Sequence, residues 1–411
     1  MARKTIRLSQ PLVGSTRDRT SRPAALRLTR SASVTPAHWE AARRLGSPLA
    51  VGPPLCDELL ALVEHTFTEE EARVVAVLRT LRGRTAGQVA RRIARPVVET
   101  EAVLRRLAHE KRAIAAHGSA AQPRYWLLPI MPGMFEMVLI GQAPDRWTPW
   151  HRRFAELVEA LFNTGYTLDY QQRPPPALFR FLPLPPISEA HPAALPSDRL
   201  EVVLERFETF GVGHCPCRMS TPPLGEGCGR PLEVCTAMGE WAERGIQAGW
   251  LRRVSRQEIL DIKRNAESHG LVTWILNVDS TRSQASCSCC GCCCKAMRMV
   301  RQFNAPGVLA PPHFLPEIEV AACNGCGRCA STCPMGALSI EPDSRSLQHH
   351  AARCIGCGLC QRACEGQRAI RLQPVPESRL PYRSWFSMLL RNAPGLLQTS
   401  WQTLFRRKGG A

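Results

Sequence analysis

The sequence of 411 residues predicts an α+β protein with several domains, and three patterns lead to this expectation. Short amphipathic helical patterns followed by strand-like segments occur before residue 129. Helical and strand-like segments then alternate up to about residue 314, and beyond it one cysteine spacing occurs twice. Because 44% of the residues are hydrophobic, the chain can form buried cores in two or three domains.

Residues 56–128 predict three short helices followed by a hairpin. The first helix begins at Thr68, which forms a capping-box pattern with Glu71, and Thr85 and Pro96 begin the other two. Strand-like pieces at 113–116 and 125–128 follow. This order resembles a winged helix-turn-helix.

A winged helix raises the question of DNA binding. The candidate exposed face of the third helix mixes acidic Glu99, Glu101 and Glu110 with Arg105 and Arg106. Such a face complements a phosphate backbone poorly. We therefore expect a packing or protein-contact module, and nucleic acid as a partner is not expected.

Residues 129–314 predict a small, cysteine-rich α+β domain. A strand is expected to end at Cys215, and another to span 271–278. Helices are expected at 150–163, 197–210, 233–244 and 255–268.

The C-terminal region, residues 315–376, contains the spacing C-x2-C-x2-C-x3-C twice, at an offset of 31 residues. The eight cysteines are Cys323, Cys326, Cys329, Cys333, Cys354, Cys357, Cys360 and Cys364. Three thiolates at every third residue can wrap one corner of a cubane, while the fourth reaches a neighbouring cluster. The spacing therefore predicts two 4Fe-4S clusters, whereas structural zinc sites usually require paired C-x2-C knuckles separated by a longer loop.

From Glu319 to about Gln373 the sequence resembles the bacterial-type dicluster ferredoxins. The resemblance implies that one cluster is held by Cys323, Cys326, Cys329 and Cys364, and the other by Cys354, Cys357, Cys360 and Cys333. Pro334 follows its cysteine as the family expects, but Glu365 stands where proline is usual. The glycines of both loops, such as Gly325 and Gly356, are expected at positive φ.

A second group of ten cysteines lies in the middle region: Cys215, Cys217, Cys228, Cys235, Cys287, Cys289, Cys290, Cys292, Cys293 and Cys294. Buried single cysteines are common, but six within eight residues indicate a ligand set. We expect at least one further metal site here, and we favour a third or fourth 4Fe-4S cluster over zinc, since a redox-silent ion beside two electron carriers explains less. Cys56 is isolated and is interpreted as an ordinary thiol.

From residue 57 to 373 the overall plan resembles a group of bacterial 4Fe-4S binding proteins with a winged-helix-like N-terminal part, a C-x-C-R element, a C-C-x-C-C-C element and a C-terminal dicluster ferredoxin domain. The resemblance implies an electron-transfer protein, with redox partner proteins as donor and acceptor. Two alternatives remain open. One is an iron-sulfur redox sensor that binds DNA, and the other is an oxidoreductase with substrate chemistry at the cysteine-rich domain.

Both ends of the chain are basic. Residues 1–45 carry a net charge of +8 and residues 379–411 carry +6, out of +18 for the whole chain. We interpret residues 1–55 as a flexible basic arm and 377–411 as a basic amphipathic tail. Most such apolar stripes pack on their own domain, and docking on a partner or an anionic membrane surface is the alternative. No run of 18 apolar residues and no export signal occurs, and the cysteines cluster in metal-ligand spacings, so a cytoplasmic location is expected.

Overall fold

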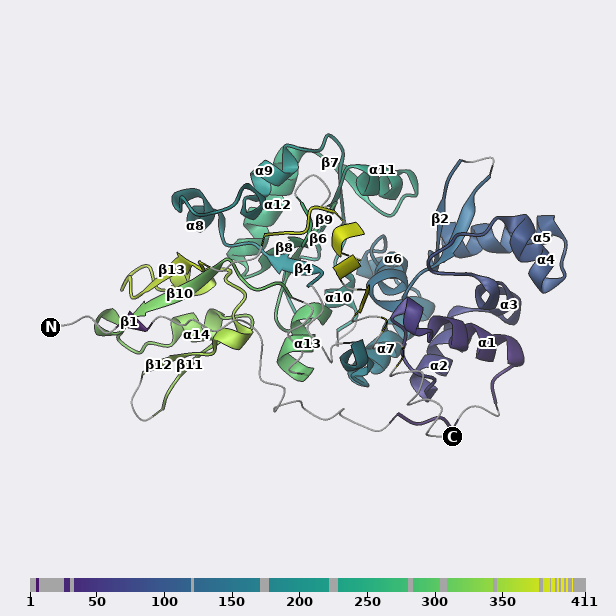
Figure 1. Ribbon diagram of the computed structural model, residues 1–411, viewed down its shortest axis with the longest axis horizontal. Coiled ribbons are helices and arrows are strands. Elements are labelled where there is room, and N and C mark those ends of the chain that lie inside the picture. The colour runs from purple at the N-terminus through teal and green to yellow at the C-terminus, as the bar shows by residue number, and fades with distance from the viewer. Residues whose placement is uncertain are drawn as a thin grey trace. The chain divides into compact units, whose positions relative to one another are not determined.

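The computed structural model describes residues 5–6, 26–29, 33–119, 122–170, 177–221, 228–279, 284–303, 309–342, 346–376, 380–384, 386–388, 390–391, 393–394, 397 and 401. The chain divides into two compact units (Figure 1). We call residues 21–172, 216–227 and 396–411 the helical unit. Residues 1–20, 173–215 and 228–395 form the sheet unit.

The helical unit contains eight α-helices and one hairpin among its described residues. The helices are α1 (Pro36–Leu45), α2 (Asp57–Thr66), α3 (Glu69–Val77), α4 (Ala86–Ile93), α5 (Val97–Arg105), α6 (Phe135–Leu139), α7 (Pro149–Asn163) and α10 (Pro216–Met219). Strands β2 (Ile114–His117) and β3 (Arg124–Leu127) pair antiparallel. The predicted capping box is confirmed, because Thr68 accepts a hydrogen bond from Glu71 N while Glu71 accepts one from Thr68 N. Thr85 forms the same arrangement with Gln88.

The predicted flexible arm, residues 1–55, is wrong for the part that forms α1. Thr35 caps this helix and Pro36 begins it. Ala41, Ala42 and Leu45 are fully buried, and α1 packs against α3. A helix with one apolar face is ordered by tertiary packing even where its composition is polar. Residues 1–4, 7–25 and 30–32 of the predicted arm lie outside the described residues.

The two arginines of the third predicted helix are engaged in ion pairs. Arg105 pairs with Glu101 at 3.0 Å. Arg106 donates from Nε to Glu71 at 3.0 Å, and Glu71 is fully buried. These cations are therefore compensated by carboxylates within the unit, and the packing or protein-contact role stays a prediction.

Residues 129–170 pack with the helical unit, so the boundary predicted at residue 129 does not coincide with the division of the chain. Helix α7 lies against α2. Trp150 Nε1 donates to the carbonyl oxygen of His65 at 3.1 Å, and the His65 ring lies 2.9 Å from the carbonyl of Trp150. The two rings stack with centroids 5.3 Å apart.

The sheet unit is built on six antiparallel strands in the order β4-β8-β9-β6-β5-β7 (Figure 1). They are β4 (Phe179–Phe181), β5 (Phe210–His214), β6 (Glu233–Met238), β7 (Arg252–Val254), β8 (Val272–Leu276) and β9 (Ala285–Cys289). The accompanying helices are α8 (Pro185–Ala190), α9 (Leu200–Leu204), α11 (Glu240–Gln247), α12 (Arg256–Ser268) and α13 (Lys295–Phe303). Helix α12, capped by Ser255 as predicted, packs on β5, β6, β8 and β9.

Two helices expected in this region differ from the structure. The segment 233–244, expected to be helical, forms strand β6 and only then α11, with Gly239 at φ +60° between them. The helix expected at 197–210 is reduced to α9, since Phe210 already belongs to β5. Strand β6 pairs with β5 and β9 on either side, and this pairing overrides the local helical pattern. Cys235, Cys287 and Cys289 therefore lie on strands and not in loops.

The C-terminal cysteine repeat forms a module of two strand pairs and two short helices (Figure 1). Strand β10 (Phe314–Glu319) pairs with β13 (Ile370–Pro374), and β11 (Leu338–Ile340) pairs with β12 (Leu347–His349). Helices α14 (Arg328–Thr332) and α15 (Leu359–Ala363) pack against each other. Near the N-terminus, β1 (Thr5–Ile6) also pairs with β10.

This module shares one apolar core with the six-stranded sheet. The core includes Val272 and Met297 from the sheet side and Phe314, Leu359 and Leu372 from the module. Packing is therefore continuous across the boundary predicted at residue 314.

Part of the predicted tail, 377–411, is anchored to the sheet unit. Tyr382 bridges to Val278, and Met388 is buried in a cluster with Leu276 and Val278. Phe386 and Leu390 remain exposed, whereas Trp385, Leu389, Leu404 and Phe405 lie outside the described residues.

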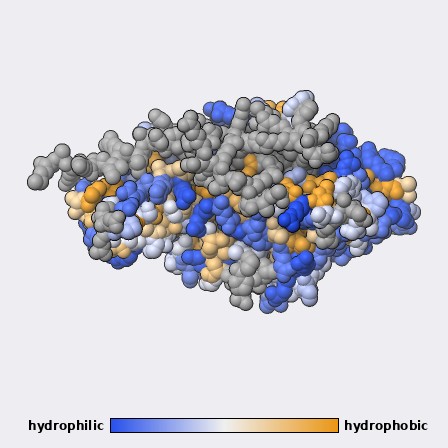
Figure 2. All heavy atoms as spheres, turned by 90° about the horizontal axis from the view of Figure 1, so that it is seen from below, coloured by the Kyte–Doolittle hydropathy of each residue, from blue (hydrophilic) through white to orange (hydrophobic). Residues whose placement is uncertain are grey.

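On the face in Figure 2, hydrophobic areas are interspersed with hydrophilic ones. No helix among the described residues is long and apolar enough to cross a membrane. Contact of the tail with a partner or membrane surface stays a prediction.

Candidate metal centres

Two cavities in the cysteine-repeat module are each lined by four thiols. The outer cavity is lined by Cys323, Cys326, Cys329 and Cys364. The inner cavity is lined by Cys333, Cys354, Cys357 and Cys360. Each cavity thus takes three cysteines from one copy of the repeat and the last cysteine from the other.

Backbone conformation explains this crossed arrangement. Gly327 and Gly358 adopt left-handed conformations at the first ends of α14 and α15, with φ of +74° and +84°. Each helix ends directly before the last cysteine of its repeat, so Cys333 and Cys364 follow α14 and α15. Gly325 and Gly356 also have positive φ, as predicted.

The two cavities differ in their electrostatic surroundings. Burial raises the pKa of Cys354 and of Cys357 to about 12 in the inner cavity. In the outer cavity, hydrogen bonds from Arg328 lower the pKa of Cys326, which is exposed. The backbone N–H of Ala337 donates to Cys333 Sγ at 3.2 Å. Buried thiols are stable as thiolates only with a cation, so four such thiols around a cavity suit a metal cluster.

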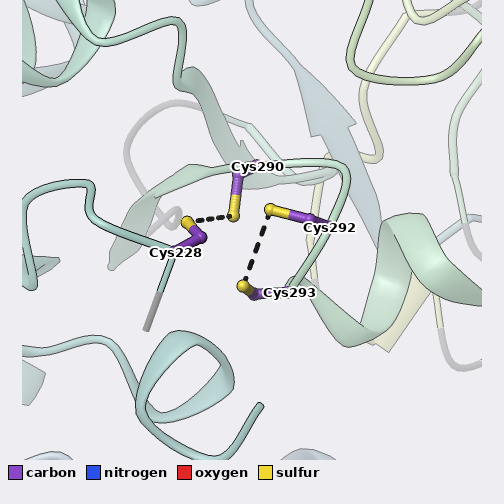
Figure 3. Close-up of side chains that lie close together, drawn as sticks. All are labelled: Cys228, Cys290, Cys292 and Cys293. Atoms are coloured by element: carbon purple, nitrogen blue, oxygen red, sulfur yellow. Dashed lines mark hydrogen bonds between the residues drawn. The ribbon is translucent and has the colours of Figure 1, made fainter. Parts of the chain in front are cut away.

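A tighter set of four thiols lies in the sheet unit, and we call it the four-thiol site. Cys228, Cys290, Cys292 and Cys293 have sulfur atoms that all lie within 4.8 Å of one another (Figure 3). Cys228 Sγ is 3.8 Å from Cys290 Sγ, and Cys293 Sγ is 3.6 Å from Cys292 Sγ. Four thiolates around one metal ion at about 2.3 Å form a tetrahedron with edges of about 3.8 Å. The spacing therefore fits a single tetrahedral ion.

Arg230 supplies positive charge at this site. Its Nη1 lies 3.5 Å from Cys228 Sγ and 3.5 Å from Cys292 Sγ. Four thiolates around a divalent ion leave two negative charges, and a guanidinium that donates to two sulfurs compensates part of them.

A third group of thiols surrounds a buried lysine. Cys235 on β6 and Cys287 on β9 face each other with sulfurs 2.9 Å apart. Thiol hydrogen bonds continue from Cys287 to Cys289 and from Cys289 to Cys294. Lys263 of α12 is 2% exposed, and burial lowers its pKa while the neighbouring Cys287 and Cys235 oppose that shift.

The structure places the remaining cysteines as follows. Cys215 follows β5 at the edge of the third group and is buried. Cys217 belongs to α10 of the helical unit. Cys56 is fully buried before α2, and burial raises its pKa to about 12.

Sequence reasoning missed three side chains beside these sites. Arg230 and Lys263 gave no signal of their own, because their roles depend on which strands lie side by side. His349 lines the inner cavity, where burial lowers its pKa to about 4. It is the last residue of β12, and the pairing of β12 with β11 fixes its place.

Residues 322–378 match the family model of the 4Fe-4S dicluster domain. No curated protein and no solved structure matches the chain. The match and the two thiol-lined cavities coincide in the same residues, so this part of the chain is an iron-sulfur cluster-binding domain of ferredoxin type.

Proposed function

We propose that the protein transfers single electrons between redox partner proteins through two 4Fe-4S clusters. One cluster is held in the outer cavity by Cys323, Cys326, Cys329 and Cys364. The other is held in the inner cavity by Cys333, Cys354, Cys357 and Cys360. The observation that carries the proposal is the crossed lining of the two cavities, which is the arrangement that the dicluster spacing requires.

The two cavities suit different ends of an electron path. Cys326 is exposed, so a partner protein can approach the outer cavity closely. The inner cavity lies in the core shared with the six-stranded sheet. Electrons exchanged with a partner at the outer cavity therefore have a short route toward the cysteine-rich sheet. We place this activity in the reducing environment of the cytoplasm, where clustered thiols stay available as ligands.

The proposal includes one further metal ion at the four-thiol site. The sequence favoured additional 4Fe-4S clusters there, but the sulfur spacing favours a single ion, because a cubane between the ligands would hold the sulfurs further apart. Four thiolates in a tetrahedron are typical of zinc. This ion would fix the turn that follows β9.

The test of this function is a redox titration of the anaerobically purified full-length protein, followed by electron paramagnetic resonance. Two one-electron centres are expected, and Cys329→Ser and Cys357→Ser should each remove one of them. A protein without any low-potential paramagnetic centre after reconstitution with iron and sulfide would contradict the proposal.

A further inference from the structure

Cys235 and Cys287 form a close pair of thiols outside the proposed metal sites. They are direct cross-strand neighbours on the antiparallel strands β6 and β9. Their sulfurs are 2.9 Å apart, so a bond of about 2.05 Å requires a movement of roughly 0.9 Å. The two residues are thus placed to form and break a disulfide without rearranging the sheet.

Lys263 provides a second, independent observation. Its ammonium group is buried, and its Nζ has no hydrogen-bond partner among the described residues. Burial lowers the pKa of Lys263, and the nearby thiols of Cys287 and Cys235 oppose that shift. A buried cation is costly unless an anion lies nearby, and a thiolate of this pair is such an anion. Lys263 therefore favours the reduced, partly ionised pair over the neutral disulfide.

The pair is also joined by packing to the inner cavity. Cys287, Cys289 and Cys294 belong to the same core as Cys354, Cys357 and Cys360. The turn after Cys290 packs so tightly on the module that a Cβ at Gly291 would lie 1.7 Å from the carbonyl oxygen of Pro334. Pro334 follows Cys333 directly, and Cys333 lines the inner cavity. The backbone contact at Gly291 therefore connects the turn after β9 with that cavity.

We propose that Cys235 and Cys287 form a redox-active dithiol that exchanges two electrons with the iron-sulfur clusters of the cysteine-repeat module. The Cys235–Cys287 disulfide takes up two electrons and two protons, its S–S bond breaks, and two thiols result. One proton suffices where Lys263 holds one sulfur as thiolate. The electrons come from the two one-electron iron-sulfur carriers, one from each, and in this respect the inference rests on the proposed function. The dithiol would turn a one-electron carrier into a two-electron store.

The test is differential alkylation of the full-length protein, which reports the thiols themselves. Protein is poised under anaerobic conditions, either oxidised or with its clusters reduced photochemically. It is then precipitated with acid, and its free thiols are alkylated with N-ethylmaleimide in denaturant near neutral pH. Disulfides are next reduced and labelled with the deuterated reagent, and peptides are analysed by mass spectrometry. Cys235 and Cys287 are expected to carry the second label together in oxidised protein and the first label in cluster-reduced protein. Cys56 is the internal control and should carry the first label throughout.

Lys263→Met sharpens the test. Loss of the buried cation should raise the ratio of disulfide to dithiol about tenfold at a fixed potential, which is about 30 mV for two electrons. Arg264→Met, on the same helix, is the matched control and should leave the ratio unchanged.

Three results would overturn the inference. The first is that both cysteines take the first label at every potential although the clusters are present. The second is that Cys235→Ser removes bound metal, because the pair would then be a ligand set. The third is a disulfide that responds to glutathione buffers but not to photoreduction of the clusters, since it would not be coupled to the module. A protein that contains no clusters contradicts the proposed function instead, and glutathione buffers then still report whether the pair forms a disulfide.

Discussion

The cysteine-repeat module and the four-thiol site each gather thiols, but they gather them at different spacings. In the module, four thiols line each cavity, but no three of them have sulfurs that all lie within 4.8 Å of one another. In the four-thiol site, all sulfurs lie within 4.8 Å of one another, and among the described residues no other group of three or more potential ligands is so compact. The space that the chain leaves between sulfurs thus indicates the size of the group they hold, a cluster in one region and a single ion in the other.

The largest effect is expected from removing a ligand of either cavity. Cys357→Ser should lose about four iron and four sulfide per chain, since a cubane that lacks one thiolate is labile. Cys329→Ser should lose the same amount from the outer cavity. Iron and sulfide analysis of the anaerobic variants provides the measurement, and Cys56→Ser is the control. Loss of about eight iron from either variant would show that the two cavities are not independent.

A smaller loss is expected at the four-thiol site. Cys290→Ser should remove one zinc per chain and leave iron and sulfide unchanged, because this thiol takes no part in either cavity. Inductively coupled plasma mass spectrometry measures both metals in one sample. A loss of about four iron from this variant would replace the single ion by a cluster.

Contact between the two regions can be tested through Gly291. A methyl group there would meet the carbonyl oxygen of Pro334, a backbone atom that can move only together with the peptide bond to Met335. Gly291→Ala should destabilise the protein by about 1–3 kcal/mol, the usual cost of overpacking, and slow reduction of the Cys235–Cys287 pair. Gly366→Ala is the matched control, since nothing lies within 4 Å of its added Cβ. Equal denaturation midpoints for the two variants would contradict the contact.

The smallest effect is expected at Glu365, where the second repeat departs from the first. Its carboxylate adds negative charge near the outer cavity, so Glu365→Gln should raise the reduction potential of the cluster held there. Glu365 is exposed, and solvent screens the charge, so the shift should stay below the roughly 59 mV of a tenfold change. A potentiometric titration checks this, and a lowered potential would contradict the electrostatic argument.

The thiols that line each cavity are those that the spacing and the ferredoxin resemblance grouped, because their positions depend on local turns. Spacing places Cys323, Cys326 and Cys329 around one point, and the helix before Cys333 directs it to the other cavity. The ten thiols of the middle region could not be sorted in this way. Cys235 meets Cys287 only because β6 pairs with β9 in one register, and the local pattern of 233–244 suggested a helix.

Helix α1 shows the same limitation for the fold. Its composition resembles the polar segment around it, and its burial against α3 depends on packing at long range. Capping patterns at Thr68, Thr85 and Ser255 predicted the helix starts correctly. Each capping side chain accepts a hydrogen bond from the backbone N–H three residues later, so the cap depends only on local sequence.

The most direct test of the account is the iron, sulfide and zinc content of the anaerobically purified full-length protein. Two cubanes and one tetrahedral ion predict about eight iron, eight sulfide and one zinc per chain. About twelve iron without zinc would contradict the account, because the four-thiol site would then hold a cluster despite its narrow spacing.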